Sequence, residues 1–185
     1  MKLSLITPPA TLPVDVAFAK SHSRVVGAQD DALIEAYIAA ATVHLDGPTG
    51  VVGRCFITQV WQIEISGWIG PVGLRVEPVQ SVKVFYTAIN GDELELDPAQ
   101  YDLNASVGRA ASLRWLGSMP QLGDAPWPVR IEVTAGKSEA DHAEKLLVLI
   151  LAADLFERRE STITGTIVAT NPVFEALLAN MRRHI

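Results

Sequence analysis

The stretch that decides the fold is CFITQVWQIEI, residues 55–65, because the spacing of apolar residues changes there. Several of its apolar residues are separated by two or four positions, a spacing that places their side chains on one face of a β-strand: Ile57, Trp61, Ile63 and Ile65. Before this stretch the apolar spacing is helical, and it becomes helical again after Ser138. The predicted order of elements is therefore helices, a β-rich middle and helices.

The first long helix is predicted over residues 31–46. Its apolar residues follow the spacing of one helix face: Ile34, Ile38, Ala41 and Leu45. Asp30 and Asp31 place carboxylates at the positive end of the helix dipole, and Gly47-Pro48 ends the helix. A shorter helix over residues 15–22 precedes it, and a loop at Gly27 joins the two.

The middle of the chain alternates apolar and polar residues, as strands do. One strand carries Val82, Val84 and Tyr86 on a single face. Asn90-Gly91 follows it and supplies the positive φ values that a tight hairpin turn requires. Further strands are expected at residues 111–116 and 129–134, and the proline-rich stretch 117–128 is predicted to be an irregular loop.

A long late helix is predicted from the Ser138–Asp141 capping box to about Glu160. The run Leu146–Leu151 is apolar around the whole helix circumference, so this segment must be covered on several sides. Neighbouring subunits of an oligomer could supply that cover, and we expect Ile150→Asp to unfold the protein or to prevent assembly.

A final helix follows a polar link over residues 161–170. Asn171 is its predicted N-cap and Pro172 its first residue, while Arg182 and Arg183 complement the negative end. Its inward face is predicted to hold Val173, Phe174, Leu177, Leu178 and Met181. The predicted fold class is thus α+β: a helical bundle, made of N-terminal helices (1–50) and long C-terminal helices (137–185), with a β-rich insertion (51–136) in one domain, 1–185.

Composition excludes several functional classes. The 185 residues are 49% hydrophobic and carry 15 basic against 21 acidic side chains, a net charge of −6. This indicates a folded, soluble, acidic protein, and without a Lys/Arg block it is not expected to grip phosphates. The single Cys55 cannot form an internal disulfide, the first ten residues lack a signal-peptide core, and the longest apolar run, 146–153, is too short to span a membrane. The cytosol is the expected compartment.

No set of residues predicts an active site, a metal site or a cofactor. The four histidines are isolated from one another in sequence: His22, His44, His142 and His184. Cys55 is interpreted as a small packed residue, and the glycine-rich stretch 47–54 as a turn, since it lacks the Lys-Ser/Thr of a phosphate-binding loop. The acidic residues at 92–97 are interpreted as a solvated strand edge and not as a calcium loop.

The four tryptophans divide into two kinds. Trp61 and Trp115 lie on apolar strand faces and are expected in the core. Trp68 and Trp127 are flanked by glycine and proline, and they are the interface candidates.

The order of these elements, with several local motifs, resembles the head-to-tail connector, or adaptor, family of long-tailed bacteriophages and gene transfer agents, also described as DNA-packaging connectors. The most telling motifs are Thr58–Trp61 and the late helix 149–160. The others are residues 5–10, 16–20, 30–34, Gly50 and 78–82. The sequence departs from the family pattern before Thr49-Gly50, where an aromatic residue is more usual.

The resemblance implies a non-enzymatic structural protein in the virion neck, made in the bacterial host cytoplasm. It would form a ring of twelve copies under the portal protein, extend the channel for double-stranded DNA, and dock the next neck protein, a stopper or a tail terminator. The family's C-terminal segment commonly docks on the portal, which makes Arg182, Arg183, His184 and Ile185 the portal-binding candidates. The acidic charge suits a channel that does not hold its DNA.

Two other functions stay open at this point. One is a monomeric peptide- or carbohydrate-binding module that uses the β-rich insertion with Trp68 or Trp127. The other is a small hydrolase that uses Cys55 with a distant histidine.

Overall fold

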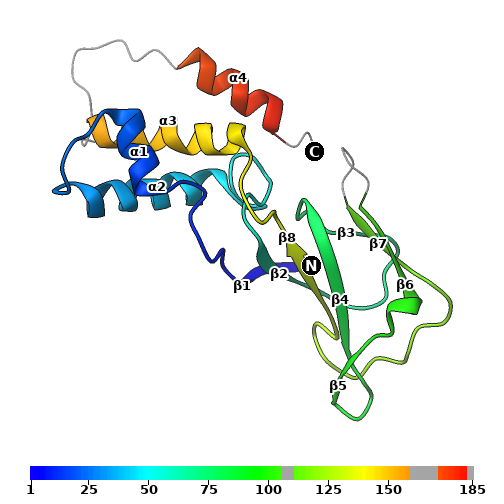
Figure 1. Ribbon diagram of the computed structural model, residues 1–185. Helices are drawn as coiled ribbons and strands as arrows, with labels where there is room; N and C mark the ends of the chain where they lie inside the picture. The colour runs from blue at the N-terminus through cyan, green and yellow to red at the C-terminus, as the bar shows by residue number, and fades with distance from the viewer. Residues whose placement is uncertain (106–110, 159–170, 183–185) are drawn as a thin grey trace. The chain divides into compact units, whose positions relative to one another are not determined.

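The computed structural model describes residues 1–105, 111–158 and 171–182, and divides into two compact units. The β unit consists of Met1–Ala10 and Thr58–Lys137, and the helical unit of Thr11–Ile57 and Ser138–Ile185. The predicted fold class is confirmed: along the chain, helices α1 and α2 precede and helices α3 and α4 follow a central antiparallel β-rich region (Figure 1). The predicted ends of the long helix at Glu160 and of the link at 161–170 lie outside the described residues.

The β unit contains two antiparallel sheets. The larger has the strand order β1-β2-β8-β4-β5, and its strands are Lys2–Thr7, Gln59–Ile65, Val129–Ala135, Val79–Thr87 and Glu93–Glu95 in that order. The smaller has the order β3-β7-β6, with strands Val72–Gly73, Ser112–Trp115 and Tyr101–Asn104. A short 3₁₀ turn, η1 (Pro98–Gln100), precedes β6.

Strand β2 behaves as the alternation predicts. Trp61, Ile63 and Ile65 are buried, and the residues between them are half-buried. Its neighbour β8 has the same pattern, with Ile131 paired opposite Ile63. The 55–65 stretch therefore builds the middle of the larger sheet, with one apolar face and one polar face.

Strand β1 was not predicted by the pattern. It pairs with β2 in antiparallel register, Lys2 opposite Glu64 and Leu5 opposite Trp61, with an irregularity before Thr7. Its partner lies more than fifty residues downstream, and its own burial follows no strict alternation. Periodicity alone therefore does not reveal it.

The hairpin between β4 and β5 forms where Asn90-Gly91 predicts it, with a different turn. The Gly91 N–H donates to the Ala88 carbonyl at 2.9 Å, and the Ala88 N–H donates to the Asp92 carbonyl at 2.8 Å. Of the Asn90-Gly91 pair, Gly91 has a positive φ, +89°, and Asn90 does not. This is a three-residue loop closed by a left-handed glycine, so the prediction that both residues adopt positive φ was wrong.

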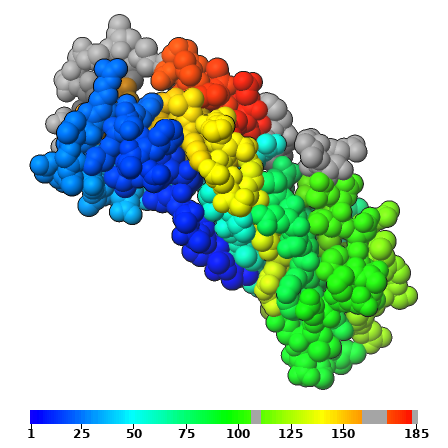
Figure 2. Space-filling view, viewed as in Figure 1, coloured from blue at the N-terminus to red at the C-terminus, as the bar shows by residue number. Residues whose placement is uncertain are grey.

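The helical unit contains α1 (Val16–Ser23), α2 (Asp31–Leu45), α3 (His142–Arg158) and α4 (Pro172–Met181). The helices predicted over 15–22 and 31–46 are confirmed. Helices α1, α2 and α4 all contact α3, and Figure 2 shows α4 (red) lying along α3 (yellow). The shared core includes Ile38, Leu45, Leu147 and Val148.

The cap of α3 lies three residues later than predicted. The Glu144 carboxylate accepts a hydrogen bond from the Asp141 N–H at 2.7 Å, and the Lys145 N–H donates to the Asp141 carbonyl at 2.9 Å. Asp141 and Glu144 thus repeat the capping-box spacing of Ser138 and Asp141. The glutamate has the longer side chain that can reach back to the N-cap N–H, so the later register forms.

The apolar run of α3 is covered by the chain itself. Within Leu146–Leu151 every residue is buried or half-buried. The expectation that the run needs cover on several sides is confirmed. Helices α1, α2 and α4 supply this cover within one chain, so the run does not by itself require neighbouring subunits.

Helix α4 begins as predicted and packs partly as predicted. The Asn171 side chain accepts hydrogen bonds from the N–H groups of Val173 and Phe174, at 3.0 and 3.4 Å. Leu178 is buried, and Phe174, Leu177 and Met181 pack against the core. Val173 is exposed, so its predicted inward position was wrong: it lies in the first turn, beside the cap, where the helix faces solvent.

The loop after α2 folds back tightly on the helix end. The Gly47 N–H donates to the Arg54 carbonyl at 2.7 Å, and the Val52 N–H donates to the Leu45 carbonyl at 3.2 Å. A Cβ atom on Gly50 would overlap the carbonyl oxygens of Leu45 and Asp46. The predicted turn over residues 47–54 is confirmed, and Gly50 is required by space.

We expect Gly50→Ala to lower the free energy of unfolding by about 1–3 kcal/mol, because the added methyl group must displace backbone atoms. Urea unfolding of the full chain measures this loss. Gly70→Ala is the matched control, since nothing lies within 4 Å of its new Cβ, and its midpoint should stay within error of the parent. Equal midpoints for the two variants would show that the loop after α2 relaxes freely.

Candidate functional site

The portal-binding candidates lie at the end of α4. Arg182 is exposed, and its N–H donates to the Leu178 carbonyl at 2.9 Å. Arg183, His184 and Ile185 lie outside the described residues. Met181, directly before Arg182, packs against the core. The exposed Arg182 thus directly follows a residue that packs against the core.

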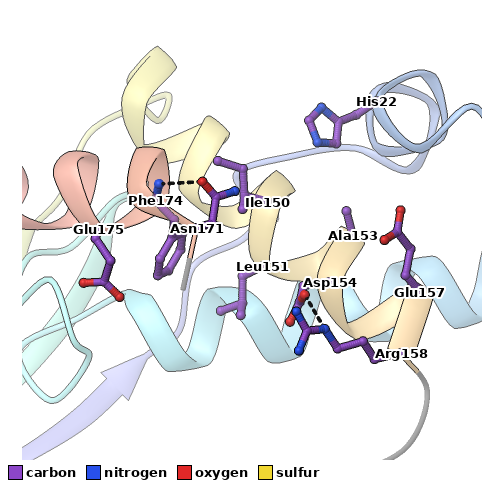
Figure 3. A pocket seen from close by; sticks show the side chains of 10 residues that line it. All are labelled: His22, Ile150, Leu151, Ala153, Asp154, Glu157, Arg158, Asn171, Phe174 and Glu175. Carbon is purple, nitrogen blue, oxygen red and sulfur yellow. Dashed lines mark hydrogen bonds and ion pairs between the residues drawn. The ribbon is translucent and has the colours of Figure 1, made fainter. Parts of the chain in front are cut away.

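A groove of about 560 Å³ lies between α1, α3 and the first turn of α4 (Figure 3). Its apolar lining includes Ile150, Leu151 and Phe174. Its polar lining consists of His22, Asp154, Glu157, Arg158, Asn171 and Glu175. The Arg158 Nε pairs with the Asp154 carboxylate at 2.7 Å. The groove thus combines apolar lining residues with carboxylates. Such a lining suits the binding of a partner's side chain better than it suits catalysis.

The histidines and the cysteine stay separate in the described part of the chain. His22 lines the groove, while His44 and His142 are exposed near the end of α2 and the start of α3. His184 lies outside the described residues. No group of three or more His, Cys, Asp or Glu in residues 1–105, 111–158 and 171–182 could hold a metal ion.

Cys55 is fully buried, as the packed-residue interpretation predicts. A thiol in that position is not reachable by a substrate from solvent, so the geometry disfavours the hydrolase alternative. Among the helices of residues 1–105, 111–158 and 171–182, none has the length and hydropathy of a membrane span.

The tryptophans of the β unit take different positions. Trp61 is buried, and its Nε1 donates to the Gln59 side chain at 2.9 Å. Trp115 is half-buried and packs edge-on against Trp68, with ring centroids 5.0 Å apart. Trp68 also lies 5.9 Å from the ring of Tyr86, and its Nε1 donates to the Pro120 carbonyl at 2.9 Å. The indole of Trp68 therefore holds the β unit together.

Trp127 has 41% of its surface exposed. Of the two interface candidates it is the one whose ring a partner can reach. Sequence reasoning did not single out Ile69 and Ile89, which are also exposed and lie in loops of the β unit. The signal for them was present, because each is an aliphatic residue next to a turn: Ile69-Gly70-Pro71 and Ile89-Asn90-Gly91.

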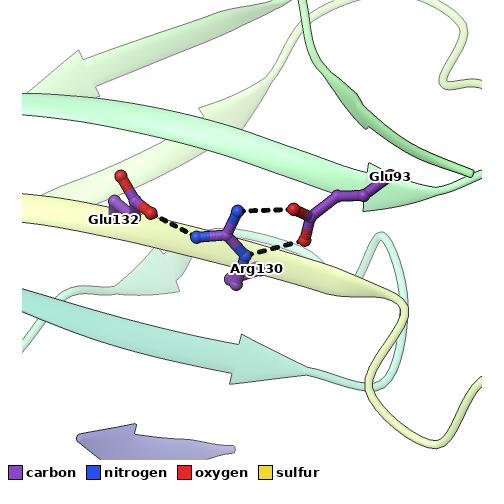
Figure 4. A network of polar contacts seen from close by, with 3 residues as sticks. All are labelled: Glu93, Arg130 and Glu132. Carbon is purple, nitrogen blue, oxygen red and sulfur yellow. Dashed lines mark hydrogen bonds and ion pairs between the residues drawn. The ribbon is translucent and has the colours of Figure 1, made fainter. Parts of the chain in front are cut away.

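The acidic hairpin carries one ordered charge network (Figure 4). The Arg130 guanidinium binds the Glu93 carboxylate through two bonds of 2.8 Å and also contacts Glu132. The same guanidinium stacks over the Phe85 ring, 4.1 Å from its centroid. Hydrogen bonding from Arg130 holds the pKa of Glu93 below its usual value. The other acids of the hairpin are exposed on the edge strand β5 and its flanks, as a solvated strand edge requires.

We expect Glu93→Gln to lower the free energy of unfolding at pH 7 by less than about 1 kcal/mol, because the Glu93 side chain is 53% exposed and solvent screens its charge. The folded-state pKa of Glu93 is depressed, so its contribution is full above the unfolded value of about 4.3 and is lost as pH falls through the folded value. Urea unfolding should therefore separate the variant from the parent at neutral pH, and the difference should disappear as the pH falls below the folded-state pKa of Glu93.

The control is Glu95→Gln, which removes the same charge from the same strand and leaves the Arg130 pair intact. A pH-independent difference between Glu93→Gln and the parent would contradict the electrostatic origin of the effect.

The structure defines an α+β protein of two compact units, and its described residues hold no group of three or more His, Cys, Asp or Glu that could bind a metal ion. No protein-family model matches the chain, and no curated protein matches it.

Solved structures do match. The chain is similar to one in the neck of an empty gene transfer agent (GTA) particle computed with C6 symmetry, with a TM-score of 0.80. It is also similar to a chain of the virion of a native GTA particle, with a TM-score of 0.75, and to one in the neck of a native GTA particle computed with C12 symmetry, with a TM-score of 0.70. Each match has 22% identity and covers 100% of this chain and 97% of the other. At this identity the likeness establishes a shared fold.

Proposed function

We propose that this chain is a structural, non-enzymatic component of the neck of a gene transfer agent or tailed-phage particle. The observation that carries the proposal is the end-to-end match to a chain of a GTA neck, with a TM-score of 0.80 and without a large unmatched segment on either side. The motif resemblance, which rests on the sequence, points to the same class independently.

Within the neck, we propose the role of head-to-tail adaptor. Twelve copies form a ring under the portal protein, extend the DNA channel and dock the next neck protein, a stopper or a tail terminator. The C6 and C12 symmetries of the matched necks are compatible with such a ring. The residues Arg182, Arg183, His184 and Ile185 are the proposed portal contact, supported by the exposure of Arg182.

The net charge of −6 is consistent with a channel through which DNA passes. Double-stranded DNA carries dense negative charge, and a wall that lacks clustered cations gives it no counterion-release affinity. The duplex therefore passes through the ring without specific binding.

Co-expression with the portal protein of the same gene cluster tests this role. The expected result is a complex that survives size-exclusion chromatography and shows a ring of this chain on the portal. The rival function, a monomeric peptide- or carbohydrate-binding module, predicts a monomer that ignores the portal. Absence of any complex, together with absence of the protein from particle necks, would reject the adaptor role.

A further inference from the structure

Three loops of the β unit gather at one end of the larger sheet. Ile65, near the end of β2, and Tyr86, near the end of β4, both pair with Val129 at the start of β8. The segments 66–71, 88–92 and 117–128 that join these strand ends therefore share that end, which we call the loop end. In Figure 1 the β4–β5 hairpin and the approach to β8 lie together at the lower edge.

Hydrogen bonds hold the loop end together, and we call this bonded set of residues the frame. The Trp68 Nε1 donates to the Pro120 carbonyl at 2.9 Å, and the Trp115 Nε1 donates to the Ile69 carbonyl at 2.7 Å. The Gly123 N–H donates to the Thr87 carbonyl at 2.8 Å, and a Cβ on Gly123 would overlap the Ala88 carbonyl oxygen. These bonds join loops 66–71 and 117–128 to each other, and they join 117–128 to the end of β4, directly before loop 88–92.

This frame holds apolar side chains outward. Ile89 is 68% exposed, Ile69 is 54% exposed and Trp127 is 41% exposed. Exposed apolar side chains scattered singly need no explanation, but these three stand on loops bonded into one end of the unit. Aromatic and aliphatic anchors held rigidly in this way are typical of contact surfaces between proteins, because little conformational entropy is lost on binding.

The three loop segments carry negative charge only. They contain Asp92 and Asp124 and no lysine or arginine. Both aspartates are exposed, and so is Glu95 of the neighbouring strand β5, while Glu93 is paired with Arg130. A second copy that presented the same end would bring like charges together, which is unfavourable in an interface. A partner with basic residues around an apolar depression complements the surface in both respects.

We propose that the loop end is the docking surface for a different protein of the particle, one whose contact site is apolar and rimmed by lysine or arginine. Resting on the adaptor role proposed above, this partner is the next neck protein, and the contacts are made by Ile69, Ile89 and Trp127. Trp68 is a frame residue of this surface and Trp127 is a contact residue.

Photo-crosslinking in assembled particles tests the assignment. The photoreactive residue p-benzoylphenylalanine replaces Ile89, or Val43 as control, which is 79% exposed on a helix of the other unit. The Ile89 position should crosslink to a structural protein that is neither this chain nor the portal, through a peptide with lysine or arginine beside apolar residues. A crosslink to a second copy or to the portal, or none at all, would overturn the proposal.

A substitution gives an independent readout. Ile89→Lys adds a charge that the basic partner repels, and it removes an exposed side chain, so the urea midpoint should not change. Particles carrying it should retain this chain on the portal and lose at least about tenfold of the next neck protein, while Val43→Lys particles keep it. Full retention in both variants would overturn the loop-end assignment alone. Particles that lack this chain altogether, even with the parent sequence, would reject the adaptor role itself.

Discussion

Leu147→Asp is expected to leave the helical unit unfolded at room temperature. Leu147 is fully buried at the centre of the α3 core. The substitution removes about 2–5 kcal/mol of side-chain packing and adds the cost of an unpaired carboxylate in an apolar interior. Together these approach or exceed the 5–15 kcal/mol by which a domain of this kind is stable. Loss of the cooperative helical transition in circular dichroism, or loss of soluble expression, measures the effect.

Ile150→Asp is the matched control on the same helix. Ile150 is half-buried and lines the groove, so a carboxylate there can turn toward solvent. The apolar pattern of the sequence alone predicts that Ile150→Asp unfolds the protein or prevents assembly. Because Ile150 is only half-buried in the structure, we instead expect this variant to fold, with a clearly smaller loss of unfolding free energy than Leu147→Asp. Equal damage from the two substitutions would contradict the burial pattern of α3.

Removal of residues 182–185 is expected to abolish portal binding and to leave the fold intact. Arg182 is exposed, so its removal takes away no buried side chain, and the last turn of a terminal helix adds little to a core. The unfolding midpoint should therefore stay within error of the parent. In co-expression the portal complex should weaken at least about tenfold, the scale expected when a central contact is removed.

The control for the deletion is Arg182→Lys with Arg183→Lys, which keeps the length and the charge of the segment. Partial binding by this variant separates the charge of the segment from the geometry of its guanidinium groups. A deletion variant that unfolds without cooperativity would show instead that the segment is part of the helical unit.

The sequence predicted most of the elements because their signals are local. Alternation identifies β2 and β8, and helical spacing with caps identifies α2 and α4. Strand β1 lacked such a signal, because its pairing partner is remote in sequence. The start of α3 was displaced by three residues because two capping boxes overlap and only side-chain reach selects between them.

The candidate sites were harder to predict from the sequence, because they depend on tertiary packing. No spacing in the sequence brings Glu175 of α4 near Ile150 of α3, so the groove could not be foreseen. The role of Trp68 also could not be predicted from its neighbours. Its flanking glycine favours an interface position, but in the structure its ring packs against Trp115 and its Nε1 donates a hydrogen bond to the Pro120 carbonyl. The sequence also did not show that α1, α2 and α4 cover the apolar run of α3 within the chain, since helix packing is not visible in a one-dimensional pattern.

The central claim is that this chain belongs to the neck. Its most direct test is a cryo-EM reconstruction of particle necks purified from the strain that encodes the chain. The account predicts a ring of density between the portal and the next neck protein, into which the helical unit and the β unit fit separately. A neck with no such density, or the chain found only in the capsid or the tail tube, would contradict it.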